Sequence, residues 1–247
     1  MSISMRRVVA TGVTLAAALA LTGCKVDLDA EEVHTAQAFP FTGTALKIRA
    51  SLGGVRVLQG TGGRVEVERW ARGKAADDGN ATWSLRDGTL RLSANCNMVF
   101  GDCGARYHVK VPPGVPLSIE ADDGVILNGL PQDVDVVSRD RIQVSGAAGK
   151  LRLRSEGPIT GEGLKSTSVR CRTSDGAIDV SFASPPTDLD LRSSDGRVTA
   201  TVPRAAYAIT ARSTDGTERS ELEHDAKSPN TIKAVSGSGD VRILRAR

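Results

Sequence analysis

One short motif recurs at a fixed interval in the second half of the chain and constrains the fold more than any other feature. Each copy contains a run of alternating apolar and polar residues, a small polar pair, and then Asp-Gly. The copies that end at Gly176, Gly196 and Gly216 are spaced by twenty residues, and related copies end at Gly124 and Gly239. A repeat of this length predicts a stacked array of small units, each of which packs only on its neighbours.

The alternation within each copy defines one buried face and one solvated face. Leu189 and Leu191 are two residues apart before one turn, and Val198 and Ala200 are two residues apart after it. Successive side chains of a strand point to opposite sides, so these apolar residues share one face. We therefore predict an all-β fold, a β-solenoid like a parallel β-helix, with short strands joined by Asp-Gly turns. An antiparallel β-sandwich is the alternative, because Asp-Gly is also a strong hairpin signal.

The Asp-Gly pairs are expected to shape the turns. Each glycine is expected to adopt the positive φ that a tight bend requires, and each aspartate to cap the backbone of its own turn. Alternatively, stacking would bring Asp175, Asp195 and Asp215 into one column at a spacing of about 4.8 Å. Such a column could bind calcium or serve acid–base catalysis in a β-helix enzyme.

The N-terminal half also predicts strands, but they are less regular. Alternating segments such as Leu46–Ala50 and Tyr107–Val111 are bounded by Gly, Asp, Asn or Pro, as strands in β-rich domains are. No apolar period of 3.6 residues continues for three turns after the N-terminal segment. We therefore expect an irregular β-strand region with a cysteine loop over residues 39–115 and a β-strand repeat region over residues 116–247.

Residues 1–23 have the layout of a secretory signal. Two arginines precede an uncharged apolar run, Val8–Leu21, and the segment ends in Leu-Thr-Gly before Cys24. These last four residues resemble the lipobox of bacterial lipoproteins. The resemblance implies cleavage before Cys24, acylation of its thiol, and lipid anchoring of an extracytoplasmic protein to the cell membrane. An ordinary signal peptide is the alternative. Residues 24–38 are polar and acidic, and we expect them to form a tether.

The other cysteines are interpreted for an exported protein, in which disulfides can persist. Cys96 and Cys103 flank a short segment, and we predict that they form a disulfide. A metal-binding pair is the alternative, although no His or further Cys lies close to them in sequence. Cys171 lies on the apolar side of a predicted strand, so we expect a buried and unreactive thiol.

Several motifs match those of a known family. They are Gly54-Val-Arg-Val57, Val109-Lys-Val-Pro-Pro-Gly114, and the repeats Ser174–Ile178 and Ser194–Val198. With these motifs the chain resembles the bacterial "putative adhesin" family of β-strand-repeat proteins, a domain of unknown function. The resemblance covers roughly residues 39–244. It implies an all-β, solenoid-like fold outside the cell, no reaction, and no catalytic residues.

The sequence offers no catalytic constellation. The three histidines, His34, His108 and His224, lie far apart, and none has a second ligand at metal-binding spacing. No serine lies in a nucleophile elbow. The formal net charge is +3, and the predicted signal carries two of the positive side chains, so nucleic acid is not an expected partner. We predict a protein that is not an enzyme and has no cofactor, metal or catalytic site.

Three arginines occupy the same place in successive copies. Arg172, Arg192 and Arg212 each stand four residues before a turn glycine, on the side of the strand predicted to face solvent. Stacking in register would align them into a cationic row. Such a row could bind an anionic envelope polymer, a lipid surface or a surface protein through paired guanidinium contacts. It could equally be a solvated face that discourages edge pairing.

These observations favour a lipid-anchored, extracytoplasmic β-repeat protein with a non-catalytic role in surface binding, adhesion or envelope structure. Two alternatives remain open. One is an accessory or sensor protein of an envelope stress system. The other is a carbohydrate-active β-helix enzyme, for which the sequence offers only the aspartate column.

Overall fold

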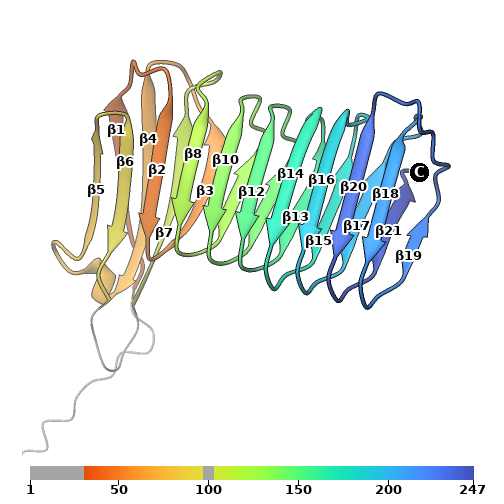
Figure 1. Cartoon of the computed structure of the whole chain (residues 1–247). Coiled ribbons are helices and arrows are strands. Elements are labelled where there is room, and N and C mark those ends of the chain that lie inside the picture. Colours follow the sequence, from red (N-terminus) through yellow and green to blue (C-terminus); the bar gives the residue numbers. More distant parts are fainter. Residues whose placement is uncertain (1–30, 97–102) are drawn as a thin grey trace, which may run out of the picture.

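The chain forms two long sheets of short strands that face each other across one core, and the strands stack as rungs along a single axis (Figure 1). The structure, a computed structural model, describes residues 31–96 and 103–247. The predicted all-β, solenoid-like fold is confirmed. The one helical element in these residues is a short 3-10 helix, Lys74–Ala76. No helix in the described part of the chain has the length and hydropathy needed to cross a bilayer.

The spatial order of the strands within each sheet differs from their order in the chain. From one edge to the other, the eleven-stranded sheet contains β1 (Val33–Pro40), β4 (Arg64–Gly73), β7 (Cys103–Val111), β3 (Gly54–Gln59), β9 (Val125–Asn128), β11 (Ile142–Ser145), β13 (Ile159–Leu164), β15 (Ile178–Phe182), β17 (Val198–Val202), β21 (Val241–Arg245) and β19 (Glu218–Ser220). The ten-stranded sheet contains, in the same manner, β18 (Ala208–Ser213), β20 (Thr231–Ser236), β16 (Asp188–Ser193), β14 (Ser168–Thr173), β12 (Leu151–Ser155), β10 (Val134–Ser138), β8 (Leu117–Ala121), β2 (Leu46–Ser51), β6 (Thr89–Ala94) and β5 (Ala81–Arg86).

From β8 onward, successive strands alternate between the two sheets, so one rung contributes one strand to each. Neighbouring rungs pair in parallel, as β12 does with β14 and β14 with β16. The predicted parity holds: Leu189, Leu191 and Val198 are buried in the shared core. Apolar side chains from every rung therefore form one continuous core that no rung could bury alone.

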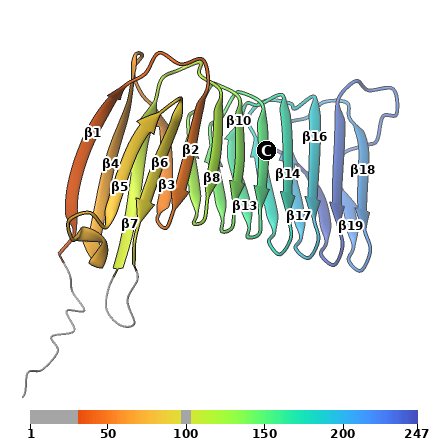
Figure 2. The same ribbon diagram turned by 60° about the vertical axis from the view of Figure 1, so that its left-hand side comes forward.

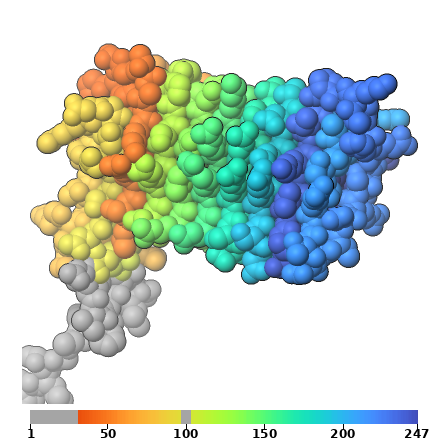
Figure 3. Space-filling view, in the orientation of Figure 1, coloured from red at the N-terminus to blue at the C-terminus, as the bar shows by residue number. Residues whose placement is uncertain are grey.

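The rungs do not stack wholly in sequence order. The last rung, β20 with β21, lies between the β16–β17 rung and the β18–β19 rung. Figure 3 shows this as a dark blue band between lighter blue bands. The repeat that ends at Gly216 is therefore separated from the repeat that ends at Gly196 by the repeat that ends at Gly239.

The N-terminal end departs from the solenoid pattern. β1, β4 and β7 pair antiparallel, and so do β5 and β6. The tether expected over residues 24–38 is therefore too long, because Val33–Pro40 pair with β4 over their whole length. Both sheets run through the expected boundary near residue 115, since β2 pairs with β8 and β3 with β9.

The predicted role of the turn glycines is wrong. Gly176, Gly196 and Gly216 are not among the glycines with positive φ. Instead, a Cβ on Gly196 would collide with the carbonyl group of Gly176, and a Cβ on Gly176 would collide with the backbone of Gly157. The stack therefore requires glycine because the backbones of adjacent rungs come too close for any side chain.

The predicted capping of each turn by its aspartate is also wrong. The Ser193 hydroxyl accepts the Gly196 N–H at 2.8 Å and donates to the Gly176 carbonyl of the next rung at 2.8 Å. Equivalent hydroxyls make the same pair of bonds at Thr173, Ser213 and Ser236. We call these four residues the hydroxyl ladder. Each member satisfies its own turn and joins it to the neighbouring rung.

Candidate functional site

Five arginines gather on the solvated side of the ten-stranded sheet, and we call them the arginine face. The pattern Leu-Arg-Leu-Arg in β12 and Val-Arg-Cys-Arg in β14 turns the apolar residues inward and the arginines outward. β16 contributes the fifth. The arginine face consists of Arg152, Arg154, Arg170, Arg172 and Arg192.

The strand register sets the spacing of this face. Arg154 pairs with Arg172, and Arg172 pairs with Arg192, so three guanidinium groups project from one row across adjacent strands. Adjacent strands lie about 4.8 Å apart. Two valines bound the row, because Val137 pairs with Arg154 on one side and Val235 with Arg192 on the other.

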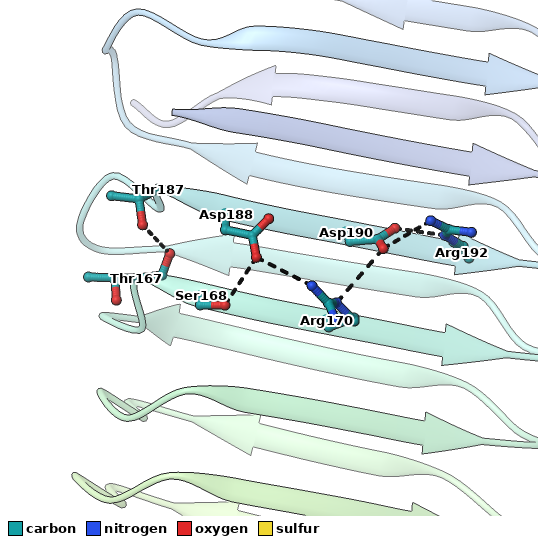
Figure 4. Close-up of polar contacts among 7 residues, drawn as sticks. All are labelled: Thr167, Ser168, Arg170, Thr187, Asp188, Asp190 and Arg192. Atoms are coloured by element: carbon teal, nitrogen blue, oxygen red, sulfur yellow. Dashed lines mark hydrogen bonds and ion pairs between the residues drawn. The ribbon is translucent and has the colours of Figure 1, made fainter. Parts of the chain in front are cut away.

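Three aspartates neutralise part of the charge. Asp135 lies 3.5 Å from Arg152 and 3.0 Å from Arg154. Asp188 lies 3.6 Å from Arg170, as Figure 4 shows. Asp190 accepts two hydrogen bonds from Arg192, at 2.8 and 3.1 Å, and lies 3.8 Å from Arg170. Its hydrogen bond raises the pKa of the Arg192 guanidinium, which stays charged. Five arginines against three aspartates leave the face with an excess of positive charge.

Arg172 differs from the other members of the face. It is exposed and has no hydrogen-bond or ion-pair partner within residues 31–96 and 103–247. With Leu153 and three other arginines of the face, it lines a hollow of about 180 Å³. Nearby, the Nε atom of Arg170 is shielded from solvent and makes no hydrogen bond with the described residues. The exposed Arg172 therefore retains guanidinium donors that an anion could engage.

The row predicted from sequence is corrected by this geometry. Arg172 and Arg192 are neighbours, but Arg212 is not next to Arg192, because Val235 pairs with both. The cause is the last rung, which lies between the two repeats. Arg154 takes the third place instead. The sequence contains a pattern that could have predicted the position of Arg154, because residues 151–155 and 169–173 share one alternation of apolar residues with arginine.

The aspartate column is interrupted in the same way. Asp175 and Asp195 belong to neighbouring rungs, but the rung before Asp215 carries Ser238 at the equivalent place. No group of three or more His, Cys, Asp or Glu side chains in the described ranges could hold a metal ion.

The cysteines follow the sequence interpretation where the structure describes them. Cys96 and Cys103 form the predicted disulfide, with their Cα atoms 5.6 Å apart. Cys171 is a free thiol buried in the core, and burial raises its pKa to about 12. Cys24 lies outside the described residues.

Sequence reasoning missed one aromatic cluster. His34 stacks on Trp70 with ring centroids 4.6 Å apart, and His108 lies 4.5 Å from the same ring. Burial, followed by the charge of Arg56, lowers the pKa of His108. The cluster comes from three strands, so only the pairing of β1, β4 and β7 could have placed these residues together.

The fold and its repeat define a class: a two-sheet β-solenoid with serine or threonine, aspartate and glycine at its turns. Within that class, the chain belongs to the Toastrack DUF4097 family, whose model matches residues 114–245. The predicted family resemblance is thereby confirmed. A comparison with curated proteins finds no match.

One solved structure shares the fold at low sequence identity, and a second is similar to a lesser degree. A "putative adhesin" from Parabacteroides distasonis is similar with a TM-score of 0.52 and 11% identity, over 88% of this chain and 98% of that one. A "putative cell adhesion protein" from Clostridium sporogenes gives a TM-score of 0.40 and 10% identity, over 87% of this chain and all of that one. At 11% identity the likeness to the Parabacteroides distasonis structure concerns the fold alone.

Proposed function

We propose that this protein is a lipid-anchored surface protein outside the cytoplasm, and that it binds an anionic polymer of the cell envelope through its arginine face without catalysis. The observation that carries the proposal is the in-register row of Arg154, Arg172 and Arg192, in which Arg172 has no ion-pair or hydrogen-bond partner among the described residues. The adhesin names of the structural neighbours agree with a binding role. The lipobox-like segment that ends at Cys24 supports the anchor.

A linear polymer suits the row better than a small anion does. Each exposed guanidinium contact contributes well under about 1 kcal/mol, so a single phosphate or carboxylate would bind weakly. A chain of such groups lying across the strands can meet several arginines at once, and the contacts then add through multivalency. The planar guanidinium fork pairs with either group in two hydrogen bonds. Binding must therefore be collective and must weaken with salt.

The test removes the positive charges of the row with substitutions that are expected to leave the fold intact. Arg154, Arg172 and Arg192 are changed together to Gln, and binding to a sized glycerol-phosphate polymer is measured at low and physiological salt. The matched control changes three arginines associated with the other sheet, Arg56, Arg197 and Arg219, to Gln. We expect salt-sensitive binding that the first variant loses and the control retains. Equal binding by all three proteins, or binding that ignores salt, contradicts the proposal.

The same experiment separates polymer from lipid. Liposomes with and without anionic lipid are tested beside the polymer. Stronger binding to anionic liposomes than to the polymer would assign the face to the membrane surface.

The anchor has its own test. Cys24→Ser should leave the chain unprocessed or release it from the membrane fraction, because acylation requires the thiol. Detergent partitioning and intact mass report the outcome. Identical partitioning of wild type and variant, without a lipid mass on the wild type, contradicts lipid anchoring and leaves the arginine-face test unaffected.

A further inference from the structure

A stack of two open sheets has four edge strands, and their protection differs. β18 and β19 lie at one end of the solenoid, and β1 and β5 at the other. Figure 2 shows β1 at the outer margin of the N-terminal end. Edge strands carry unpaired N–H and C=O groups that can pair with another chain, and proteins usually block them.

The C-terminal edges are partly blocked by the chain itself. In β18, alternate residues donate to β20, which leaves the N–H groups of Ile209, Ala211 and Ser213 directed outward. The Nδ1 atom of His224 accepts the N–H of Ile209 at 3.0 Å, and the carboxylate of Glu218 accepts that of Ser213 at 2.7 Å. β19 has only three residues.

At the N-terminal end, β5 is blocked at its first residue. The Arg69 guanidinium donates to the outward carbonyl group of Ala81 and lies over the Trp83 ring, 4.4 Å from its centroid. Its Nε also donates to Thr35 at 3.2 Å. Through these contacts Arg69 of β4 connects β1 in one sheet to β5 in the other, on the inner side of β1.

β1 is blocked only at its end among the described residues, where Pro40 has no N–H group. Phe41 donates to Gly63 at 3.0 Å, in the register that β1 keeps with β4. Antiparallel pairing alternates, so the odd-numbered residues of β1 bond to β4. The N–H and C=O groups of His34, Ala36 and Ala38 therefore face away from β4, where no described strand pairs. β1 contains no Asp, Glu, Lys or Arg.

We infer that β1 is the docking edge for a second copy of this chain, through antiparallel β1–β1 pairing about a two-fold axis at Ala36. In this register Ala36 pairs with itself, and His34 pairs with Ala38 of the second copy. All three free residues then exchange hydrogen bonds in both directions. A two-fold axis is the usual symmetry of such self-complementary contacts.

The side chains on the inner side of β1 also favour pairing with a second copy in this register. Val33 is 45% exposed and is one of three exposed large apolar side chains in the described part of the chain. The same pairing places Val33 opposite Phe39 of the second copy, a residue only partly buried against its own core. Directly opposite side chains of an antiparallel pair are in contact distance. Self-pairing therefore covers apolar surface that the single copy leaves exposed.

β1 is also held ready for pairing. His34 stacks on Trp70, and Glu32 bonds to Arg106 at 2.7 Å. These contacts fix the strand on its sheet before a partner arrives, which lowers the entropy cost of association. The small side chains of Ala36 and Ala38 leave the outer face open at the axis.

The first test is cross-linking of the full chain. Ala36→Cys places two thiols beside the two-fold axis, at a Cα separation of about 5.5 Å, within disulfide range. Mild oxidation should give a reducible dimer in high yield. The control, Gln143→Cys, places the thiol on the interior strand β11 and carries the same native cysteines, so it should give none. No dimer with Ala36→Cys, or linkage to a different protein, overturns the inference.

The second test is sedimentation of the full chain over a range of concentrations. Wild type should shift from monomer to dimer, and the Ala36→Lys, Ala38→Lys double variant should stay monomeric, because charges at the axis repel. Ala36 and Ala38 are both exposed, so unchanged thermal unfolding will verify the fold. Gln143→Lys should dimerise like wild type. A wild type that is monomeric throughout, or a double variant that still dimerises, overturns the inference.

Discussion

The hydroxyl of Ser193 donates to the carbonyl oxygen of Gly176, which belongs to the neighbouring rung, at 2.8 Å. The same hydroxyl accepts the N–H of the glycine three residues later in its own turn. This double role explains why a hydroxyl residue stands three positions before each turn glycine. The motif is therefore a connection between rungs, and its aspartate is not the group that closes the turn.

Ser193→Ala should destabilise the protein by about 1–3 kcal/mol, because it leaves a donor and an acceptor without partners at a buried position. Ser193→Thr should retain most of the stability, since Thr173 makes the same pair of bonds in the preceding rung. Thermal and urea unfolding of the three proteins provide the measurement. Equal losses for alanine and threonine would show that the hydroxyl is not the cause.

Gly196→Ala should be more damaging, by at least about 3 kcal/mol, because the new Cβ meets the backbone of Gly176 and the rungs must separate. Gly62→Ala is the matched control, since nothing lies within 4 Å of a Cβ at that glycine. Its effect on the unfolding midpoint should be small. If both variants unfold alike, close approach of the rungs is not what requires glycine.

The fold could be predicted from the sequence because every rung of a solenoid has the same pattern of alternating residues and the same type of turn. Alternation in residues such as Leu189 and Leu191 sets the buried face, and equal copies pair in register. The order of the rungs could not be predicted in this way. The copies at Gly196, Gly216 and Gly239 carry similar turns, so any of them fits beside another, and only the packing of the whole C-terminal end decides their order.

The arginine face could likewise be predicted only where the rungs follow the order of the sequence. Arg172 and Arg192 lie where the repeat places them, whereas Arg212 follows the displaced rung. Arg154 was missed because its copy is one residue shorter before the turn. The roles of Trp70 and Arg69 depend on antiparallel pairing of β1 and β4, for which the repeat provides no information.

The disulfide-bonded cysteines and the buried thiol should differ in the conditions under which they can be alkylated. Without reductant, Cys96 and Cys103 should resist alkylation, and the Cys171 thiol should stay unlabelled at pH 8, because burial raises its pKa to about 12 and excludes the reagent. Denaturant alone should expose Cys171, and reductant should release the other two. Changing Cys96 and Cys103 together to Ser should cost at most about 2–3 kcal/mol on the chain-entropy model. Peptide mass mapping distinguishes these states.

Asp240 should make stability fall in acid. Its carboxylate accepts the Thr217 N–H at 3.0 Å and the Thr217 hydroxyl at 2.8 Å, and Arg242 donates to it at 2.8 Å. These bonds lower the pKa of Asp240 from 3.8 to about 2. The folded state binds a proton less readily than the unfolded state, so the stabilisation is full above about pH 4 and is lost as the pH falls through about 2.

The measurement compares wild type with Asp240→Asn across this range. The difference in melting temperature should be constant from pH 5 to pH 7, shrink below pH 4, and vanish near pH 2. Asp78→Asn, at an exposed position, is the control. A difference that does not change with pH would mean that the charge of Asp240 contributes nothing.

Val235→Arg should extend the arginine row and strengthen polymer binding. Val235 pairs with Arg192 on one side and Arg212 on the other, so an arginine there would join the two into a continuous row of five with Arg154 and Arg172. One further exposed contact contributes well under about 1 kcal/mol, so affinity at low salt should rise by less than about five-fold and depend more steeply on salt. The added repulsion should lower the melting temperature slightly. Val235→Gln, measured against the same polymer, should leave both affinity and salt dependence unchanged. Equal affinity of the arginine and glutamine variants would show that continuity of the row does not matter for binding.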